Sequence, residues 1–230
     1  MTGLERFEMV PPRDHQKRLF DQTTEPAESG LHNSEAEWRL FVVHKHDATR
    51  LHYDFRLEHA GVLKSWAVPR GPCLDPSQRR LAVLVNDHAI EYGGFEGTIP
   101  AGLYGAGTVL LWDGGRWRTD QDVDQALRAG ELKFQLCGRK LNGSWSLSRT
   151  SWPGAKREEW LLKKENDTEA KSLSEIDILI AQPASVLTGR TLEEIASEPP
   201  LWPPAKSTRN AKSRKPAPDQ LSLFPENLEP

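Results

Sequence analysis

The chain has 230 residues, of which 30 are Lys or Arg and 33 are Asp or Glu, so its formal net charge at pH 7 is −3. This length fits one domain of ordinary size, or one domain with tails. The near-neutral charge excludes a wholly basic, histone-like nucleic-acid binder, but it is compatible with a local basic groove. Two cysteines are too few for a disulfide framework or a cysteine-based zinc site.

The chain also lacks the sequence features of export and membrane insertion. Its N-terminus has no apolar core typical of a signal peptide, and no run approaches the ~18 apolar residues of a membrane span. We therefore expect a soluble, cytoplasmic protein.

Residues 1–36 are polar and include a Pro-Pro pair, which predicts an N-terminal arm with little structure of its own. From Trp38 onward the chain changes to short alternating runs divided by Gly and Pro, and we expect a domain over residues 37–195. The predicted strands are Leu40–His46, Leu51–Glu58, Ser65–Val68, Leu81–Asn86, Gly107–Trp112, Glu131–Cys137, Gly143–Arg149 and Glu159–Lys163. Their number and spacing favour a compact barrel or sandwich. We expect a mostly β fold, with a compact β-barrel-like core, a few short helices and disordered termini.

The remaining segments are read from their composition. Residues 122–129 (DVDQALRA) predict a short helix that ends where Gly130 can serve as its C-cap. Residues 168–181 hold either a second helix or an irregular wrap. The apolar pattern then fades, so residues 196–218 predict a basic disordered linker, and residues 219–230 form a separate C-terminal peptide motif with a tight apolar cluster.

Residues 50–58 (RLHYDFRLE) are the most informative segment. Apolar and ionisable residues alternate strictly along it, so one face of the strand is apolar and the other is ionisable. His52 and Asp54 share the ionisable face, and Arg50 and Arg56 flank them. A histidine and a carboxylate at this spacing can bind one divalent cation, and the arginines can hold an anion that the cation also binds.

The preceding run adds two imidazoles on a shared face, those of His44 and His46. Residues 47–50 are long enough for a turn, so this run should fold back on the next and bring His46, His52 and Asp54 together. Two imidazoles and a carboxylate leave open positions for water and substrate, and this donor set suits Mn²⁺, Fe²⁺ or Zn²⁺. The alternative is a solvated polar strand face that binds no metal.

A histidine, three arginines and a glycine-rich run follow these strands and are further candidates for a function. His88 ends an apolar run, and it is either a general acid/base or phosphate ligand, or a loop histidine without a role. Arg70, Arg79 and Arg80 would form an anion-binding pocket if they faced the same side; as isolated charges they would be solvated. The glycine-rich run 95–107 lacks the Gly-Lys-Ser/Thr of a P-loop, and we expect a structural loop at the barrel mouth.

Several long motifs occur in order along the chain. They are HDATRLHYDFRL (46–57), LKSWAVPRGP (63–72), DH (87–88), FEG (95–97), YGAG (104–107) and SVLTGR (185–190). Together, over about residues 17–194, they resemble the 3′-phosphoesterase domain of bacterial ATP-dependent DNA ligase D. The resemblance implies a Mn²⁺-dependent enzyme on a β-barrel-like core, with Co²⁺ or Zn²⁺ as other candidate cations. Such an enzyme removes a 3′-terminal ribonucleoside to leave a 3′-phosphate, and then hydrolyses that phosphate to a 3′-OH.

The resemblance also assigns catalytic roles, residue by residue. The matched metal ligands are His46, His52 and Asp54. Arg56 and Arg80 match the arginines that clamp the phosphate, and His88 matches the catalytic histidine beside the scissile phosphate.

Three more positions are implied to contact the substrate. Tyr92 matches a position near the active site. Arg70 stands where the family usually has Lys, and it keeps the charge without a compact ammonium. His44 stands where Gln or Glu is common, which puts the balance between the nuclease and phosphatase steps in doubt.

Ligase D in its long form also carries nucleotidyltransferase and primase-polymerase domains, which 230 residues cannot hold. We therefore expect a stand-alone, nucleoid-associated module that acts on DNA or RNA-tipped DNA 3′ ends, with DNA ligase and polymerase acting in trans. The alternative is a non-catalytic module that binds nucleic-acid ends and recruits repair partners. A pure binder needs basic and aromatic surface but no metal triad, which disfavours this alternative. A small-molecule phosphatase is disfavoured by the basic linker, which suits a polyanion.

The C-terminal motif consists of Gln220, Leu221, Ser222, Leu223 and Phe224. It resembles the short peptides by which many bacterial replication and repair proteins dock on the sliding clamp. A flexible linker of roughly 20 residues in front of it has a typical span of about 25 Å, which would let the tail reach a ring around DNA. The alternative is a segment that packs back on the domain.

Overall fold

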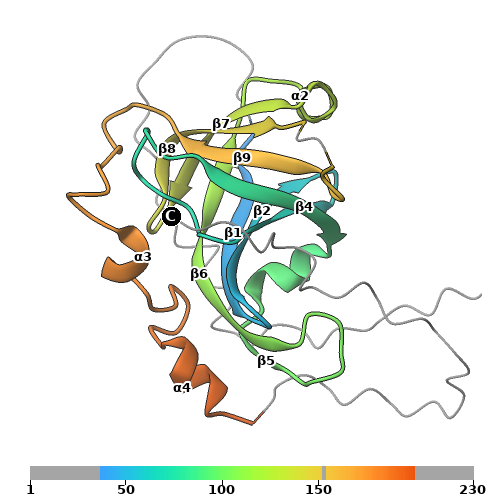
Figure 1. Ribbon diagram of the computed structural model, residues 1–230, viewed down its shortest axis with the longest axis vertical. Coiled ribbons are helices and arrows are strands. Elements are labelled where there is room, and N and C mark those ends of the chain that lie inside the picture. The colour runs from blue at the N-terminus through green and yellow to red at the C-terminus, as the bar shows by residue number, and fades with distance from the viewer. Residues whose placement is uncertain (1–36, 152–153, 200–230) are drawn as a thin grey trace, which may run out of the picture.

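The computed structural model describes residues 37–151 and 154–199 (Figure 1). The expected arm over 1–36, nearly all of the expected linker and the C-terminal motif lie outside these residues. The elements are β1 (Arg39–Asp47), β2 (Leu51–His59), β3 (Val62–Val68), β4 (Arg80–His88), the 3₁₀ helix η1 (Ile90–Gly94), β5 (Gly97–Ile99), β6 (Gly107–Arg118), α2 (Val123–Ala129), β7 (Glu131–Gly138), β8 (Asn142–Arg149), β9 (Glu159–Lys164), α3 (Ile178–Ala181) and α4 (Leu192–Ala196).

Eight antiparallel strands form a closed barrel, which confirms the predicted core. The strands follow the order β1-β2-β3-β4-β9-β8-β7-β6, and pairing of β1 with β6 closes the ring. The short strand β5 adds to β6 outside the ring. Because β1 pairs with β2 on one side and with β6 on the other, its register is fixed from both edges.

Each of the eight predicted strands is present, and two differences have a physical cause. The prediction ended the fifth strand at Trp112, before two glycines, but β6 continues through them to Arg118. Gly115 permits a close approach there, because a Cβ at that position would lie 2.1 Å from the carbonyl oxygen of Cys137. The run 95–107, expected to be only a loop, contains the three-residue strand β5.

The helices are short, as expected, and none in the described ranges is long and apolar enough to cross a membrane. In α2 the Asp122 side chain accepts a hydrogen bond from the backbone N–H of Gln125, and Gly130 takes the left-handed conformation at φ 83°. These two caps confirm the predicted helix and its end. Of residues 168–181, only the last four are helical, so the irregular wrap was the correct alternative.

The barrel interior is filled by aromatic and aliphatic side chains. Every strand of the ring contributes, through Phe41, Phe55, Trp66, Ala82, Trp117, Phe134, Trp145 and Trp160 among others. Tyr53, Phe55 and Leu57 of β2 face this core, so the alternation in the sequence is confirmed on its apolar face. The ionisable residues of β2 therefore lie on the outer face of the barrel.

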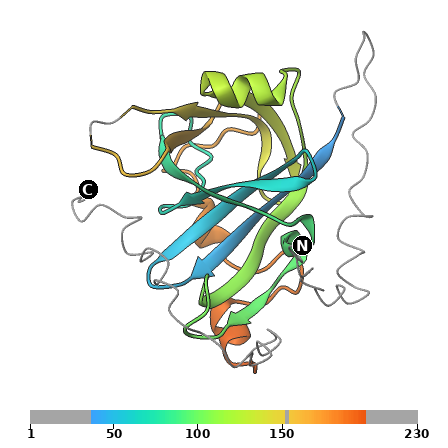
Figure 2. The same ribbon diagram turned by 90° about the vertical axis from the view of Figure 1, so that its right-hand side faces the viewer.

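The outer face of β1 and β2 is buried as well, because further segments cover it. A Cβ at Gly93 of η1 would lie 3.4–3.6 Å from side chains of Leu40, Val42 and Leu63, so the helix packs closely on this face. Residues 184–190 cover the neighbouring part, where the N–H of Val186 donates to the carbonyl of Leu111 at 2.9 Å. Figure 2 shows β1 and β2 side by side, with their connecting turn next to the loop that joins β5 and β6.

A buried carboxylate holds the covering segment in place. Glu96, 5% exposed, accepts hydrogen bonds from the hydroxyls of Ser185 and Thr188, both at 2.5 Å. It also accepts from the N–H of Leu111 at 3.2 Å and from Arg190 at 3.1 Å. The segment 185–190 is thus tied to the barrel beside β1 by charge-assisted hydrogen bonds.

Gly107 provides a test of the close packing between β6 and the β1–β2 turn. Its φ is 136°, and a Cβ there would lie 2.3 Å from the carbonyl oxygen of Asp47. We expect Gly107→Ala to lower the free energy of unfolding by about 2 kcal/mol, through backbone strain and overpacking. Chemical denaturation measures this change. Gly94→Ala is the control, because its Cβ would meet nothing within 4 Å. Equal stability of the two variants would contradict the close approach.

Candidate metal and phosphate site

The hairpin of β1 and β2 builds the centre of the site. As predicted, the chain turns back over residues 47–50, which places His46 directly opposite His52 and His44 directly opposite Asp54. Side chains opposite each other on antiparallel strands lie close enough to interact. All four are buried, with exposed fractions of 7% or less, so the alternative of a solvated polar face is wrong.

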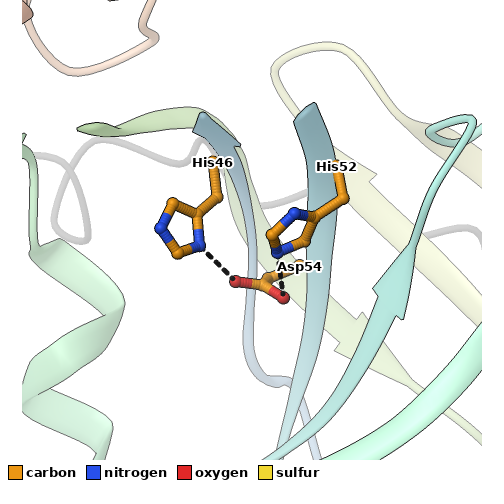
Figure 3. A group of neighbouring side chains, drawn as sticks. All are labelled: His46, His52 and Asp54. Carbon is orange, nitrogen blue, oxygen red and sulfur yellow. Dashed lines mark ion pairs between the residues drawn. The ribbon is translucent and has the colours of Figure 1, made fainter. Parts of the chain in front are cut away.

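His46, His52 and Asp54 converge as a donor set (Figure 3). One ligand atom from each lies within 4.8 Å of the others. The Asp54 carboxylate lies between the rings, with its oxygens 3.7 Å from His46 Nδ1 and 3.6 Å from His52 Nε2. Two imidazoles and one carboxylate on neighbouring strands match the donor types of a divalent transition-metal site.

Two details of the imidazoles support this fit. His52 Nδ1 donates to the carbonyl of Arg50 at 2.9 Å, which leaves the lone pair of this ring on Nε2. Such an outer hydrogen bond is how proteins orient metal-ligating histidines. His46 Nε2 is buried and has no hydrogen-bond partner among the described residues, an arrangement that costs free energy unless a further group binds there.

The Arg56 guanidinium, 2% exposed, lies behind the donor set and makes four hydrogen bonds. Nη2 donates to Asp54 at 2.9 Å, and Nη1 donates at 2.8 Å to both Ser65 and His88. Nε donates to His44 Nδ1 at 3.3 Å. A guanidinium has five N–H bonds, so one N–H, on Nη2, is not used by these four contacts.

Arg56 sets the charge of its neighbour Asp54. Burial by itself would raise the pKa of the Asp54 carboxyl, but the guanidinium and the imidazoles of His46 and His52 lower it well below its usual range. The carboxylate is therefore ionised at neutral pH. For His52, burial lowers the pKa and outweighs the opposing effect of Asp54. Neutral imidazole beside ionised carboxylate is the protonation state that binds a cation.

His44 and His88 are both held as neutral imidazoles with a defined tautomer. An arginine can only donate, so Nδ1 of each ring accepts and the ring proton resides on Nε2. Burial, followed by the charge of Arg56, lowers the pKa of His44 to about 3 and that of His88 to about 4. His44 Nε2 is buried and lacks a hydrogen-bond partner in the described part of the chain.

Tyr92 of η1 forms one wall of the site. Its ring lies 5.2 Å from the Arg56 guanidinium, 5.4 Å from the His44 ring and 5.2 Å from the His88 ring. On its other side it stacks on Phe95 at 5.3 Å. Burial, above all, raises the pKa of the Tyr92 phenol to about 12, so the hydroxyl is neutral at physiological pH.

The other predicted arginines lie at strand ends. Arg70, just beyond β3, and Arg79, just before β4, are both exposed. Arg80 opens β4 opposite Leu162, and its Nε is buried without a hydrogen-bond partner within residues 37–151 and 154–199. The pKa of Asp75 is lowered mainly by hydrogen bonds, from the N–H of Leu173 first, with a smaller contribution from Arg80. The substrate contacts expected of Arg70 and Arg80 stay predictions.

Sequence reasoning missed Ser65. Its hydroxyl is buried, accepts from Arg56 and donates to the carbonyl of Leu63 at 2.9 Å, so it fixes the guanidinium. Ser65 is also the direct strand partner of Arg56. The available signal was a single hydroxyl in the otherwise apolar end of the third strand, on the face that β2 makes ionisable.

The chain is similar to a known domain family and to several longer proteins. Residues 44–149 match the family model of the DNA ligase D 3′-phosphoesterase domain. The multifunctional non-homologous end joining protein LigD of Pseudomonas aeruginosa is 48% identical over 208 residues, which is 90% of this chain and 24% of that protein. The LigD protein of Mycobacterium tuberculosis H37Rv is 40% identical over 139 residues, 60% of this chain and 18% of the relative.

A third relative, LigD of Mycolicibacterium smegmatis, is 38% identical over 152 residues, 64% of this chain and 19% of its own length. The chain thus spans about a quarter or less of the length of these relatives. The family match covers the donor set, Arg56, His88 and Tyr92, which are the residues that the fold brings together. The chain belongs to the family of DNA ligase D 3′-phosphoesterase domains.

Proposed function

We propose that this protein repairs DNA 3′ ends by metal-dependent phosphoester hydrolysis. It removes 3′-terminal ribonucleosides and 3′-phosphates and leaves 3′-OH ends, on which DNA ligase and polymerase act in trans. The observation that carries this proposal is the buried donor set of His46, His52 and Asp54 directly beside Arg56. The matching family and the end-joining role in the names of the relatives support DNA ends as the substrate.

In this proposal His46, His52 and Asp54 hold one divalent cation, with Mn²⁺ as the expected ion and Co²⁺ or Zn²⁺ as others that suit the donors. When bound, the cation supplies Lewis-acid polarisation of the phosphate. The orphaned His46 Nε2 and the ionised Asp54 carboxylate support this role.

The other residues bind and orient the phosphate. Arg56 contributes a fixed positive charge and its remaining Nη2 N–H, because its other four N–H bonds orient neighbouring side chains. His88 presents an Nε2–H, and this tautomer favours hydrogen bonding to the phosphate or leaving oxygen, which stabilises developing charge. His44 Nε2–H is a second donor of the same kind. Arg70 and Arg80 extend the positive charge along the substrate.

The donor set can be tested by substitution. We expect His52→Ala or Asp54→Asn to reduce both Mn²⁺ affinity and cleavage of a 5′-labelled primer ending in one ribonucleotide. The loss should exceed the roughly 10–100-fold typical of outer-shell changes. Calorimetric Mn²⁺ titration and product gels, with and without EDTA, measure the two quantities. His59→Ala is the matched control, because His59 lies on the same strand but bonds Asp124. If His52→Ala keeps most of its Mn²⁺-dependent activity, the assignment of the ligands is wrong.

The tautomer of His88 gives a second prediction. Because burial and the Arg56 charge depress its pKa to about 4, the ring should stay neutral, with the proton on Nε2, from pH 8 down to about pH 5. Nitrogen-15 NMR of the imidazole, recorded in EDTA, reports both the tautomer and the titration. Replacing Arg56 by Gln removes the nearby positive charge and should raise the His88 pKa. A wild-type His88 that titrates near pH 6.5 would contradict this arrangement.

We further propose that Gln220, Leu221, Ser222, Leu223 and Phe224 dock the enzyme on the sliding clamp. The three apolar side chains and the glutamine amide support this assignment. Tethering through the expected linker would raise the local concentration of enzyme at 3′ ends without a new contact in the active site.

A labelled peptide covering residues 218–230 tests clamp docking. We expect saturable binding to purified clamp by fluorescence anisotropy, because the apolar side chains would be buried in the complex. The double variant Leu223→Ala/Phe224→Ala should bind at least roughly tenfold more weakly, since two buried side chains are truncated. Negligible binding by both peptides would disprove docking.

A further inference from the structure

The loop between β5 and β6, residues 100–106, presents an aromatic side chain to solvent. Tyr104 is 65% exposed, whereas Tyr53 is buried and Tyr92 is half-buried. None of the proposed functions of the site uses Tyr104. A single exposed ring needs no explanation by itself, so a role for Tyr104 depends on where the loop places it.

Local turns fix the loop that carries this ring. The N–H of Leu103 donates to the carbonyl of Pro100 at 3.3 Å, and the N–H of Ala106 donates to the carbonyl of Leu103 at 3.2 Å. Gly102 and Gly105 have φ values of 85° and 75°, a conformation that other residues rarely adopt. Residues 100–103 and 103–106 thus form two consecutive turns, and Tyr104 is a central residue of the second turn.

The same loop adjoins the donor set. It leads into β6, where Thr108 pairs with Asp47 and Val109 pairs with His46. The β1–β2 turn and the β5–β6 loop consequently lie side by side at one end of these strands (Figures 1 and 2). Leu51, next to the ligand His52, adds a second exposed apolar side chain there, at 45% exposure.

Tyr104 also affects the pKa of Tyr92, the aromatic wall of the site. Burial is the main cause of the raised pKa of Tyr92, and Tyr104 adds a smaller effect in the same direction. Tyr92 contacts Arg56 and His88, the groups expected to hold the phosphate. The exposed ring of Tyr104 thus lies beside the place where the 3′ end of a nucleic acid would be bound.

We propose that Tyr104 is a stacking platform for the base of the 3′-terminal nucleotide. This inference rests on the proposed function of the site. The site itself offers positive charge and N–H donors, which bind phosphate but leave the base without a partner. Stacking on an aromatic ring is tolerant of base identity, which suits an enzyme that must process ends of any sequence.

Kinetics on paired substrates test the proposal. Two primer-templates differ only at the 3′-terminal ribonucleotide, which is adenosine in one and an abasic riboside in the other. We expect Tyr104→Ala to raise KM for the adenosine end roughly tenfold, as loss of one base–aromatic stack predicts, with kcat unchanged. The abasic end should show no such change. Tyr104→Phe keeps the ring and should behave as wild type.

Ile180→Ala is a matched control, because Ile180 is an exposed apolar residue, at 77%, on α3. This variant should leave KM unchanged for both substrates. Equal KM values for wild type and Tyr104→Ala would overturn the proposal. An equal loss on both substrates would also overturn it, because Tyr104 would then support the loop and not the base.

A binding measurement separates this inference from the proposed function. With 2-aminopurine as the 3′-terminal base, wild type and Tyr104→Phe should quench its fluorescence on binding, and Tyr104→Ala should not. If wild type cleaves neither primer-template, the proposed hydrolysis is wrong. The quenching measurement then still shows whether Tyr104 stacks on the terminal base. Cleavage without any Tyr104-dependent quenching would leave the hydrolysis intact and refute the platform.

Discussion

The buried guanidinium of Arg56 is the interaction on which the rest of the site depends. A buried positive charge costs free energy unless it is paired and fully hydrogen-bonded, and Asp54, at 2.9 Å, provides the pairing. The same charge keeps that carboxylate ionised, and it adds to burial, the larger cause, in lowering the pKa of the His44 and His88 imidazoles. Because arginine only donates, its neighbours must turn acceptor atoms towards it. Side chains from β1, β3 and β4 are thereby oriented by a single residue of β2.

The barrel supplies the rigidity that this arrangement needs. β1 carries His46 and is paired along both edges, and β2 lies between β1 and β3. Donor atoms on such strands keep their separation without help from loops, which preorganises the site. The covering layer adds a second constraint, since Glu96 accepts three hydrogen bonds from the segment 185–190 and one from Leu111 of β6. The side chains of the candidate site are therefore already assembled by the fold itself.

The β1–β2 hairpin and the faces of its side chains could be predicted from the sequence, because the alternation and turn length that specify them lie within one short segment. Strict alternation over 50–58 placed His52 and Asp54 on one face, and a turn of four residues sufficed to bring His46 opposite His52. The central role of Arg56 could not be predicted in this way, because its partners Ser65 and His88 come from two other strands. The register shift between Leu63 and Ser65, which sets His88 relative to Arg56, has no signature in composition or period. The extension of β6 to Arg118 could not be predicted either. The two glycines suggested a turn, but Gly115 instead permits the close approach of two backbones within the sheet.

The hairpin strand β2 has two buried faces with different contents, an apolar one inside the barrel and an ionisable one outside it. The interior aromatic cluster fills the barrel, and the outer cluster brings together the histidines, Asp54 and Arg56 of the candidate site. Neighbouring residues of β2 are therefore under different constraints, which are close packing on the inner face and charge pairing with hydrogen bonding on the outer face. A substitution on the outer face that keeps these pairings can alter the cluster without disturbing the packing of the barrel interior. The two-sided strand thus makes the fold a suitable scaffold for redesigning the outer cluster.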